Sequence, residues 1–398
     1  MNEILELFKQ FENKRNEIEM PLSEMKDILN RFDRGICIYG AGSAGIAFCH
    51  YLQRIQVKPL CFIDGNPKKR GTICEGVRVL CIEDIKKERL EESLIIVCIN
   101  TDGKRYCKSF DDALRVGGHH GVYEKLYGAG CKYIIDYTFF RRCFGFFHKE
   151  EFNAPSCSDI DLMMQHKQDI ADVYELLDGE FSRDIFLKIV KFRLLDDSLE
   201  IPTLSQENQY FESGIYHKRD DAVFFDCGAY RGNSLDTFLR INGTKFERYY
   251  GVEPDKVNYN LLRQYVNGLA NETAEKCCLE QGAVWDARST LKLYALDGPG
   301  SFISNANHLE KVQAKTIDEM VGGSKVTFIK MNIEGSEKQA LRGARETVEK
   351  YRPQLAIAGY HRTEDLWEIP LMIKSFNLKY KIDLRSYMNH ISFVYYAT

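Results

Sequence analysis

Residues 224–232 read FFDCGAYRG, an apolar run that ends in a glycine-rich turn. A short apolar run of this kind, followed by an amphipathic segment, is typical of a buried strand that leads into a helix. A second such run, FERYYGVEPD at residues 246–255, follows the amphipathic segment. The stretch therefore predicts the first strand of a parallel sheet in an α/β domain.

Another glycine turn lies earlier in the chain, in IYGAGSAG at residues 38–45. Gly40, Gly42 and Gly45 have the G-x-G-x-x-G spacing, which permits a tight turn, a close ligand approach and helix–strand contact. The turn contains no acid, so the following helix N-terminus is open to a pyrophosphate. Asp64 ends the next strand, where it would meet ribose hydroxyls. Two interpretations fit: a nucleotide-binding loop, or glycines that serve backbone geometry alone.

The turn at 224–232 differs because Asp226 stands inside it. A carboxylate there would repel a pyrophosphate and favour a cationic ligand group. S-adenosylmethionine carries an α-ammonium and a sulfonium and no phosphate. Glu253 ends the second strand, where it could accept hydrogen bonds from both ribose hydroxyls. The two acids predict an S-adenosylmethionine site, and Glu253 argues against a core strand with an incidental aspartate.

The remaining patterns divide the chain into four parts. Residues 1–32 are expected to be helical, with one apolar face formed by Ile4, Leu7, Phe8 and Phe11. This face would pack either on the next domain or on a second copy of the chain, so a homo-oligomer is one of the two possibilities. Residues 33–130 predict a Rossmann-like nucleotide-binding domain, 131–214 a mostly helical connector, and 215–398 a second α/β domain. The last of these ends in two strands joined by a short turn at Met388-Asn389.

Composition excludes several classes of protein. Lys and Arg number 54 against 58 Asp and Glu, and no basic run is interleaved with aromatics, so nucleic-acid binding is not expected. The 13 cysteines form no CxxC pair and no zinc-type cluster with histidine, which predicts no metal site and a reducing cytoplasm. The His119-His120 pair is expected to be exposed, and no apolar run is long enough to span a bilayer.

Four ordered stretches carry a family resemblance: FFDCGAYRG at 224–232, GVEPD at 251–255, FIKMNIEGSEKQALRGA at 328–344 and GYHRTEDLWEIP at 359–370. From about residue 205 onward the chain resembles the FkbM family of S-adenosylmethionine-dependent methyltransferases. The resemblance implies a class I fold, a seven-stranded sheet whose last strand is antiparallel, flanked by helices. It implies cofactor contacts from Asp226, Gly228, Ala229, Tyr230, Gly232, Asn233, Glu253 and Ala283. Ala283 would lie near the adenine, and Asn233 could instead cap its helix.

Methyl transfer from a sulfonium is an in-line displacement, so the protein must orient the acceptor and, for a hydroxyl, remove its proton. Candidate residues follow the fourth and fifth strands: Asn332, Glu334 and His361. The family pattern is Asp-x-Glu-Gly, so Asn332 departs from it and is a poor base that could still orient a ligand. Glu334 either contacts the acceptor or is a first-turn helix acid. His361 is either the general base or a histidine outside the acceptor site.

The first domain has a resemblance of its own. GICIYGAGSAG at 35–45 and PLCFIDGNPKKRGTICEGVRVL at 59–80 resemble the N-terminal domains of bacterial sugar acyltransferases, where the nucleotide part of a sugar-nucleotide lies at the glycine loop. Together the resemblances imply O-methylation of a sugar hydroxyl on a nucleotide-linked or glycan precursor. One alternative is an NAD(P)-dependent oxidoreductase acting through the first domain, although residues 100–215 contain no Tyr-x-x-x-Lys. Another is a binding protein with degenerate sites, an interpretation that Asn332 favours.

Overall fold

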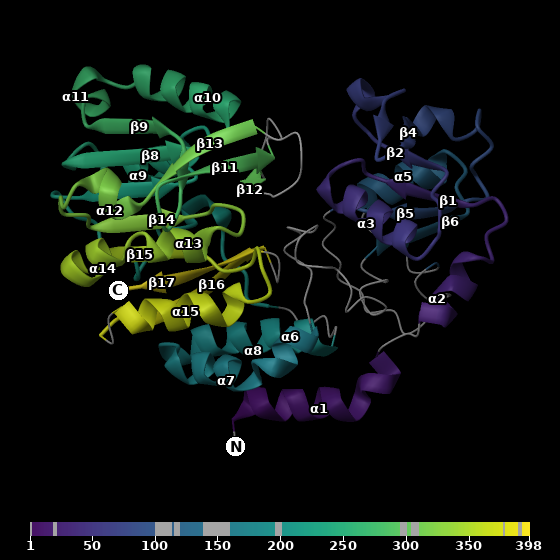
Figure 1. The fold of residues 1–398 in the computed structure, drawn as a ribbon, viewed down its shortest axis with the longest axis horizontal. Coiled ribbons are helices and arrows are strands. Elements are labelled where there is room, and N and C mark those ends of the chain that lie inside the picture. The colour runs from purple at the N-terminus through teal and green to yellow at the C-terminus, as the bar shows by residue number, and fades with distance from the viewer. Residues whose placement is uncertain are drawn as a thin grey trace. The chain divides into compact units, whose positions relative to one another are not determined.

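The computed structural model describes residues 2–18, 22–99, 114, 120–137, 160–195, 201–294, 301–303, 310–376, 379–388 and 392–398 (Figure 1). They form two compact units. The first comprises residues 5–165 and 190–199, and the second residues 2–4, 166–189 and 200–398. The expected class, two α/β domains with helices between them in the sequence, is confirmed. The expected turn residue Asn389 and His119 of the histidine pair lie outside the described residues.

The first unit is built on a six-stranded sheet of order β3-β4-β2-β1-β5-β6. Its strands are β1 (Ile36–Tyr39), β2 (Cys61–Ile63), β3 (Ile73–Cys74), β4 (Val77–Leu80), β5 (Leu94–Val97) and β6 (Tyr133–Asp136). All neighbours are parallel except β3 and β4. The described helical segments are α1 (Glu3–Ile18), α2 (Leu22–Leu29), α3 (Ser43–Arg54), η1 (Pro67–Lys69), η2 (Ile82–Asp84) and α5 (His120–Gly128).

Two features of the N-terminal half bear on the sequence predictions. The expected apolar face of α1 is buried, with Ile4, Leu7, Phe8 and Phe11 all at most 7% exposed. Strand β6 pairs with β5, although the sequence pattern assigned its residues to the helical connector. The strand is only four residues long, and its tertiary pairing with β5 is what defines it.

The second unit contains a seven-stranded sheet of order β16-β17-β15-β14-β7-β8-β9. Its strands are β7 (Val223–Cys227), β8 (Arg248–Glu253), β9 (Cys277–Gln281), β14 (Phe328–Met331), β15 (Gln354–Ala358), β16 (Ile382–Met388) and β17 (Ser392–Ala397). The last strand, β17, is antiparallel to both of its neighbours, and β7 to β9, β14 and β15 pair in parallel. The expected seven-stranded sheet with an antiparallel last strand is therefore present.

The remaining described helices lie before or between the strands of this sheet in the sequence. They are α6 (Ile160–Gln165), α7 (Lys167–Leu176), α8 (Gly179–Leu195), η4 (Gln206–Asn208), α9 (Asn233–Asn242), α10 (Lys256–Asn267), α11 (Asn271–Ala274), α12 (Ile317–Val321), α13 (Glu337–Arg342), α14 (Arg345–Tyr351) and α15 (Asp365–Phe376). Of these, α6 and the last residues of α8 belong to the first unit. The central strand β7 is buried along its whole length and contributes Phe224 to an aromatic core with Phe238 and Phe328. Burial on both faces explains why this strand reads as a continuous apolar run.

A second, small sheet of order β10-β13-β11-β12 was not predicted. It contains β10 (Ala283–Val284), β11 (Ser289–Tyr294), β12 (Phe302–Ile303) and β13 (Glu310–Lys315). The run KCCLEQGAVWD at 276–286, which contains the predicted residue Ala283, is divided between β9 and β10, and these belong to different sheets. Periodicity within one run cannot show this change of partner.

The strand order places the functional residues at one edge of the large sheet. The chain runs outward from β7 through β8 to β9, and then returns to β14 and β15 on the other side of β7. This reversal between β7 and β14 is a topological switch point, where the loops after the two strands diverge and leave a crevice. The glycine turn after β7 and the Asn332–Gly335 turn after β14 lie at this point.

Candidate active site

The turn after β7 is shaped by three residues with left-handed backbone: Gly228 at φ +77°, Tyr230 at φ +51° and Gly232 at φ +98°. A Cβ at Gly228 would overlap the carbonyl oxygen of Asn332 in the turn after β14. Glycine is thus required here both by the backbone angle and by the close approach of two turns. Gly232 is the N-cap of α9, so Asn233 is the first residue of the helix and not the cap that the sequence allowed.

Glu253 ends β8 next to this turn and is 5% exposed. One carboxylate oxygen accepts the backbone N–H of Tyr230 at 2.8 Å, and the other accepts that of Asp255 at 3.0 Å. Burial raises the pKa of Glu253 to about 7, against the lowering effect of these two hydrogen bonds. Each oxygen keeps a second lone pair, so the carboxylate can still accept ligand hydroxyls.

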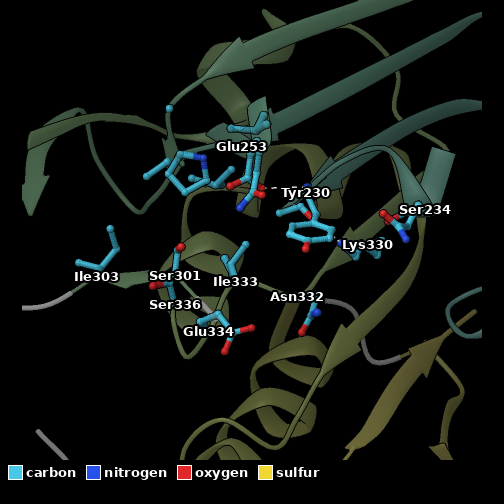
Figure 2. Close-up of a pocket in the computed structure, with 18 of the residues that line it drawn as sticks. Tyr230, Ser234, Glu253, Ser301, Ile303, Lys330, Asn332, Ile333, Glu334 and Ser336 are labelled. Atoms are coloured by element: carbon cyan, nitrogen blue, oxygen red, sulfur yellow. Dashed lines mark hydrogen bonds between the residues drawn. The ribbon is translucent and has the colours of Figure 1, made fainter. Parts of the chain in front are cut away.

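A cavity of about 500 Å³ opens between the two turns (Figure 2). The sequence-predicted residues that line it are Gly228, Tyr230, Asn233, Glu253, Ala283, Asn332 and Glu334. Figure 2 draws Glu253, Tyr230, Asn332 and Glu334 around this cavity, with Ile303 of the small sheet at its far wall. The structure thus gathers residues from β8, β10, the two turns and the start of α9 around one space.

Asp226 does not reach this cavity, which corrects the role predicted for it. Its side chain is fully buried, 2.9 Å from the Nζ of Lys330 and 2.9 Å from the hydroxyl of Tyr249, which donates to it. The Lys330 charge compensates the carboxylate within the protein. Asp226 therefore offers no free charge to a cationic ligand. Ala229 and Gly232 are also buried behind the turn, where they shape it without lining the cavity.

Glu334 lines the cavity from the turn after β14, with its side chain 24% exposed. It adopts left-handed backbone at φ +53°, which is uncommon for a residue with a Cβ, and Gly335 follows at φ +90°. Buried Glu337 holds the turn by accepting the N–H groups of Ile333 at 2.8 Å and Gly335 at 3.0 Å. Burial raises the pKa of Glu334. Constrained backbone of this kind is often found where a side chain is held for function.

His361 is not placed as a general base, and this corrects the prediction made from its position. It is 3% exposed and does not line the cavity. Its Nδ1 lies 2.9 Å from Glu337 Oε1, and its Nε2 lies 3.5 Å from Glu334 Oε2. Burial by itself would lower the pKa of His361, but the carboxylates of Glu337 and Glu334 have the larger, opposite effect. The pKa is therefore raised to about 9. The imidazole is therefore protonated at neutral pH and cannot accept a proton from an acceptor hydroxyl.

Asn332 lines the cavity and accepts a hydrogen bond from the Tyr360 hydroxyl at 3.1 Å. It lies where an orienting amide was expected. Glu337, His361 and Asp365 bring three atoms of metal-ligand type within 4.8 Å of one another. Both oxygens of Glu337 already accept backbone amides, and Glu337 Oε1 also lies 2.9 Å from the Nδ1 of His361. These three residues are better explained as a buried ion-pair cluster that braces the turn.

Several lining residues escaped the sequence analysis. Gln206, Gln209 and Tyr210 come from the segment before β7, and Ser301 and Ile303 come from the small sheet. Gln209 donates to the Tyr210 hydroxyl at 3.3 Å and to the Ser392 hydroxyl at 3.2 Å, which ties this segment to β17. No local pattern marks these residues. Lys330 did carry a signal, because it is a charged residue in the middle of an apolar strand.

In the glycine turn of the first unit, the geometry requires glycine at positions 40 and 45, whereas position 42 has free space for a side chain. A Cβ at Gly45 would overlap the carbonyl oxygen of Gly40, and Gly40 has φ +103°. A Cβ at Gly42 would meet nothing within 4 Å. Asp64 accepts the N–H of Ala41 at 2.8 Å and pairs with Lys69 at 3.1 Å. Against the effect of burial, hydrogen bonds from the backbone and from Lys69 lower the Asp64 pKa.

Asp64 also lines a separate cavity of about 690 Å³ in the first unit. The other lining residues include Tyr39, Pro67, Lys86 and Lys125, while the three loop glycines are not among them. Of the residues predicted to bind a nucleotide, Asp64 therefore lines this cavity, whereas Gly40, Gly42 and Gly45 do not. None of the described helices combines the length and the apolar character that a bilayer crossing requires.

The fold and site of the second unit define an α/β domain of the methyltransferase type, with a cavity at the switch point of a seven-stranded sheet. Residues 226–394 match the family model described as the methyltransferase FkbM domain. The C-terminal region therefore contains an FkbM methyltransferase domain.

One solved structure matches the fold over the whole length of this chain. The crystal structure of methyltransferase FkbM from Methylobacillus flagellatus KT is 19% identical, with a TM-score of 0.69, and the match covers 99% of this chain and 100% of that one. Aeropyrum pernix fibrillarin with bound S-adenosyl-L-methionine is 12% identical, with a TM-score of 0.30, over 46% of this chain and 67% of that one. No curated protein matches the sequence significantly.

Proposed function

We propose that the second unit uses S-adenosylmethionine to methylate a hydroxyl group of a sugar or glycan precursor. The observation that carries the proposal is Glu253, a buried carboxylate at the end of β8 that faces the cavity beside the glycine turn. A carboxylate at this strand end can accept both hydroxyls of a ribose. The FkbM domain match at residues 226–394 supports methyl transfer as the reaction.

The charges around the cavity favour a cofactor without phosphate. Among the described lining residues the charged side chains are Glu253, Lys330 and Glu334. Lys330 is held by Asp226, so its charge is already compensated. A pyrophosphate would meet two carboxylates and no uncompensated cation there. The charges that line the cavity, and not the buried Asp226, thus favour S-adenosylmethionine.

The start of α9 suits the amino-acid end of that cofactor. Asn233 and Ser234 line the cavity in the first turn of this ten-residue helix. Helix N-terminal N–H groups favour a carboxylate. Glu253 and Asn233 would thus hold the ribose and the carboxylate, with the turn 228–232 between them. When bound, S-adenosylmethionine supplies an activated methyl group on a sulfonium sulfur.

The acceptor end is formed by neutral hydrogen-bonding groups and one carboxylate. Gln206, Gln209, Tyr210 and Asn332 offer amide and hydroxyl groups, and Glu334 offers the carboxylate. This set suits a neutral compound with several hydroxyls. In the proposed step a C–O bond forms as the C–S bond breaks, sulfur keeps the electron pair of that bond, and Glu334 receives the hydroxyl proton. The raised pKa of Glu334 suits it to accept this proton.

The first unit supports a second, separate proposal, the binding of a nucleotide-linked substrate. Its support is the open direction at Gly42 together with the cavity that begins at Asp64. Lys86 and Lys125 line that cavity, and their ammonium groups could meet a phosphate. The hydride-transfer alternative gains no comparable feature among the described residues.

Calorimetric titration of the full chain with S-adenosylhomocysteine, NADH and a UDP-sugar tests the proposal. We expect S-adenosylhomocysteine to bind with a Kd of roughly micromolar order, and Glu253→Gln to weaken it by about tenfold or more. The matched control is Glu272→Gln, which alters a carboxylate that is 84% exposed on α11. Binding of NADH but not of S-adenosylhomocysteine would refute the methyltransferase assignment of this cavity.

A further inference from the structure

Lys330 is a buried cation at the centre of the second unit. It lies in β14, is 2% exposed, and has its Nζ 2.9 Å from Asp226 Oδ1. The same ammonium donates to the carbonyl oxygens of Gly228 at 2.7 Å and Cys227 at 3.2 Å. Two of the three N–H donors of the ammonium are thus used by turn carbonyls, and its contact with Asp226 is an ion pair.

The surroundings fix Lys330 in this position. Its ammonium lies 5.3 Å from the centre of the Tyr210 ring, a cation–π distance. Asp226 is held from its other side by the Tyr249 hydroxyl at 2.9 Å. Figure 2 draws Lys330 in the cavity wall near Tyr230 and Ser234. Lys330 therefore borders the ligand space while its ammonium is held by Asp226 and by two backbone carbonyls.

The glycine turn is held at two separate points. Glu253 holds its middle through the N–H of Tyr230, and Lys330 holds its beginning through the carbonyls of Cys227 and Gly228. Without the ammonium, these two carbonyl oxygens and the buried Asp226 carboxylate would face one another with no cation between them. Such acceptor groups repel each other strongly at low dielectric, so the beginning of the turn would have to change its path.

We propose that Lys330 is a positioning residue that fixes the beginning of the glycine turn for the amino-acid end of the cofactor. This inference rests on the proposed function. It assigns no ligand contact to Lys330, whose ammonium is paired with Asp226 and bonded to two carbonyls of the turn. It also explains the buried Asp226: the carboxylate holds the lysine, and the lysine holds the turn. The ribose end, held by Glu253, should be independent of it.

The experiment compares two ligands that share the ribose and the adenine. Full-length wild type, Lys330→Met and the double variant Asp226→Asn/Lys330→Met are titrated with S-adenosylhomocysteine and with 5′-methylthioadenosine, which lacks the amino-acid end. Lys330→Met alone leaves Asp226 buried without its ion-pair partner and can unfold, so the neutral double variant carries the test. Tyr249→Phe is the matched control, because it removes the other partner of Asp226 and leaves the turn carbonyls held.

We expect the double variant to melt within about 5 °C of the wild type and to bind S-adenosylhomocysteine about tenfold more weakly or worse, with 5′-methylthioadenosine changed by less than about threefold. Wild-type affinity for S-adenosylhomocysteine in the double variant would overturn the inference, as would equal loss of both ligands. Failure of the wild type itself to bind S-adenosylhomocysteine would overturn the proposed function and this inference with it.

Discussion

Replacing His361 by glutamine should destabilise the second unit at acidic and neutral pH, and this effect should fade as the pH rises. The imidazole is buried between Glu337 and Glu334, at 2.9 and 3.5 Å. Burial lowers its pKa, but the two carboxylates raise it more, from 6.5 to about 9. A shift of this size corresponds to about 3 kcal/mol of the free energy of unfolding.

The direction of the pH effect follows from where the proton is held more tightly. The folded protein keeps the His361 proton up to about pH 9, whereas the unfolded chain releases it near 6.5. The stabilisation is therefore complete below pH 6.5, falls as the pH rises from 6.5 to about 9, and is lost above that. Glu334 and Asp365 also titrate in this cluster, so only the difference between wild type and variant isolates His361.

Urea unfolding followed by tryptophan fluorescence measures this difference. The chain has two tryptophans, Trp285 and Trp367, and both belong to the second unit, so their signal reports on that unit. We expect the difference in the free energy of unfolding between wild type and His361→Gln to shrink by about 3 kcal/mol between about pH 6 and about pH 9.5.

A difference that stays constant with pH, or grows as the pH rises, would refute the reasoning, because either result means that His361 is neutral in the folded protein. It would then again be a candidate for the general base. The matched control is His217→Gln, which removes an exposed imidazole from the same unit. A surface substitution of this kind should change the free energy of unfolding by less than about 0.5 kcal/mol.

Three further predictions concern other parts of the chain. Gly45→Ala should lower the melting temperature by about 5 °C or more, because its Cβ would overlap the Gly40 carbonyl oxygen, whereas Gly42→Ala should melt like the wild type; equal melting by circular dichroism would contradict this. Binding of S-adenosylhomocysteine should tighten by about threefold or more from about pH 6 to about pH 8, since Glu253 has a pKa of about 7 and its ionised form accepts hydroxyls better, and Glu253→Gln should abolish the change in calorimetry. Glu334→Gln should slow labelled-methyl transfer to an accepted glycoside by about 100-fold with unchanged S-adenosylhomocysteine affinity, and an unaltered rate would exclude Glu334 as the base.

Several residues that line the candidate site can be recognised from the sequence alone. Apolar runs and the glycine turns marked β7, β8 and β14, and residues at the carboxyl ends of parallel strands must meet at one edge. This is why Glu253, Asn332 and Glu334 could be named in advance as neighbours. Likewise, the glycines at 228 and 232 mark in the sequence two positions where the backbone has left-handed angles.

What the sequence could not determine were the partners of the charged groups. In the sequence, nothing near Asp226 compensates its charge. In the structure, the ammonium of Lys330, about a hundred residues further along the chain, lies 2.9 Å from its carboxylate. From the sequence, His361 is a candidate general base. In the structure it is buried beside Glu337, whose carboxylate raises the pKa of the imidazole and keeps it protonated. The ionic state of a side chain depends on solvent access and on neighbours brought in by other strands. Sequence therefore determined where polar groups meet at the sheet edge, and only the tertiary structure decided which of them remain open to a ligand.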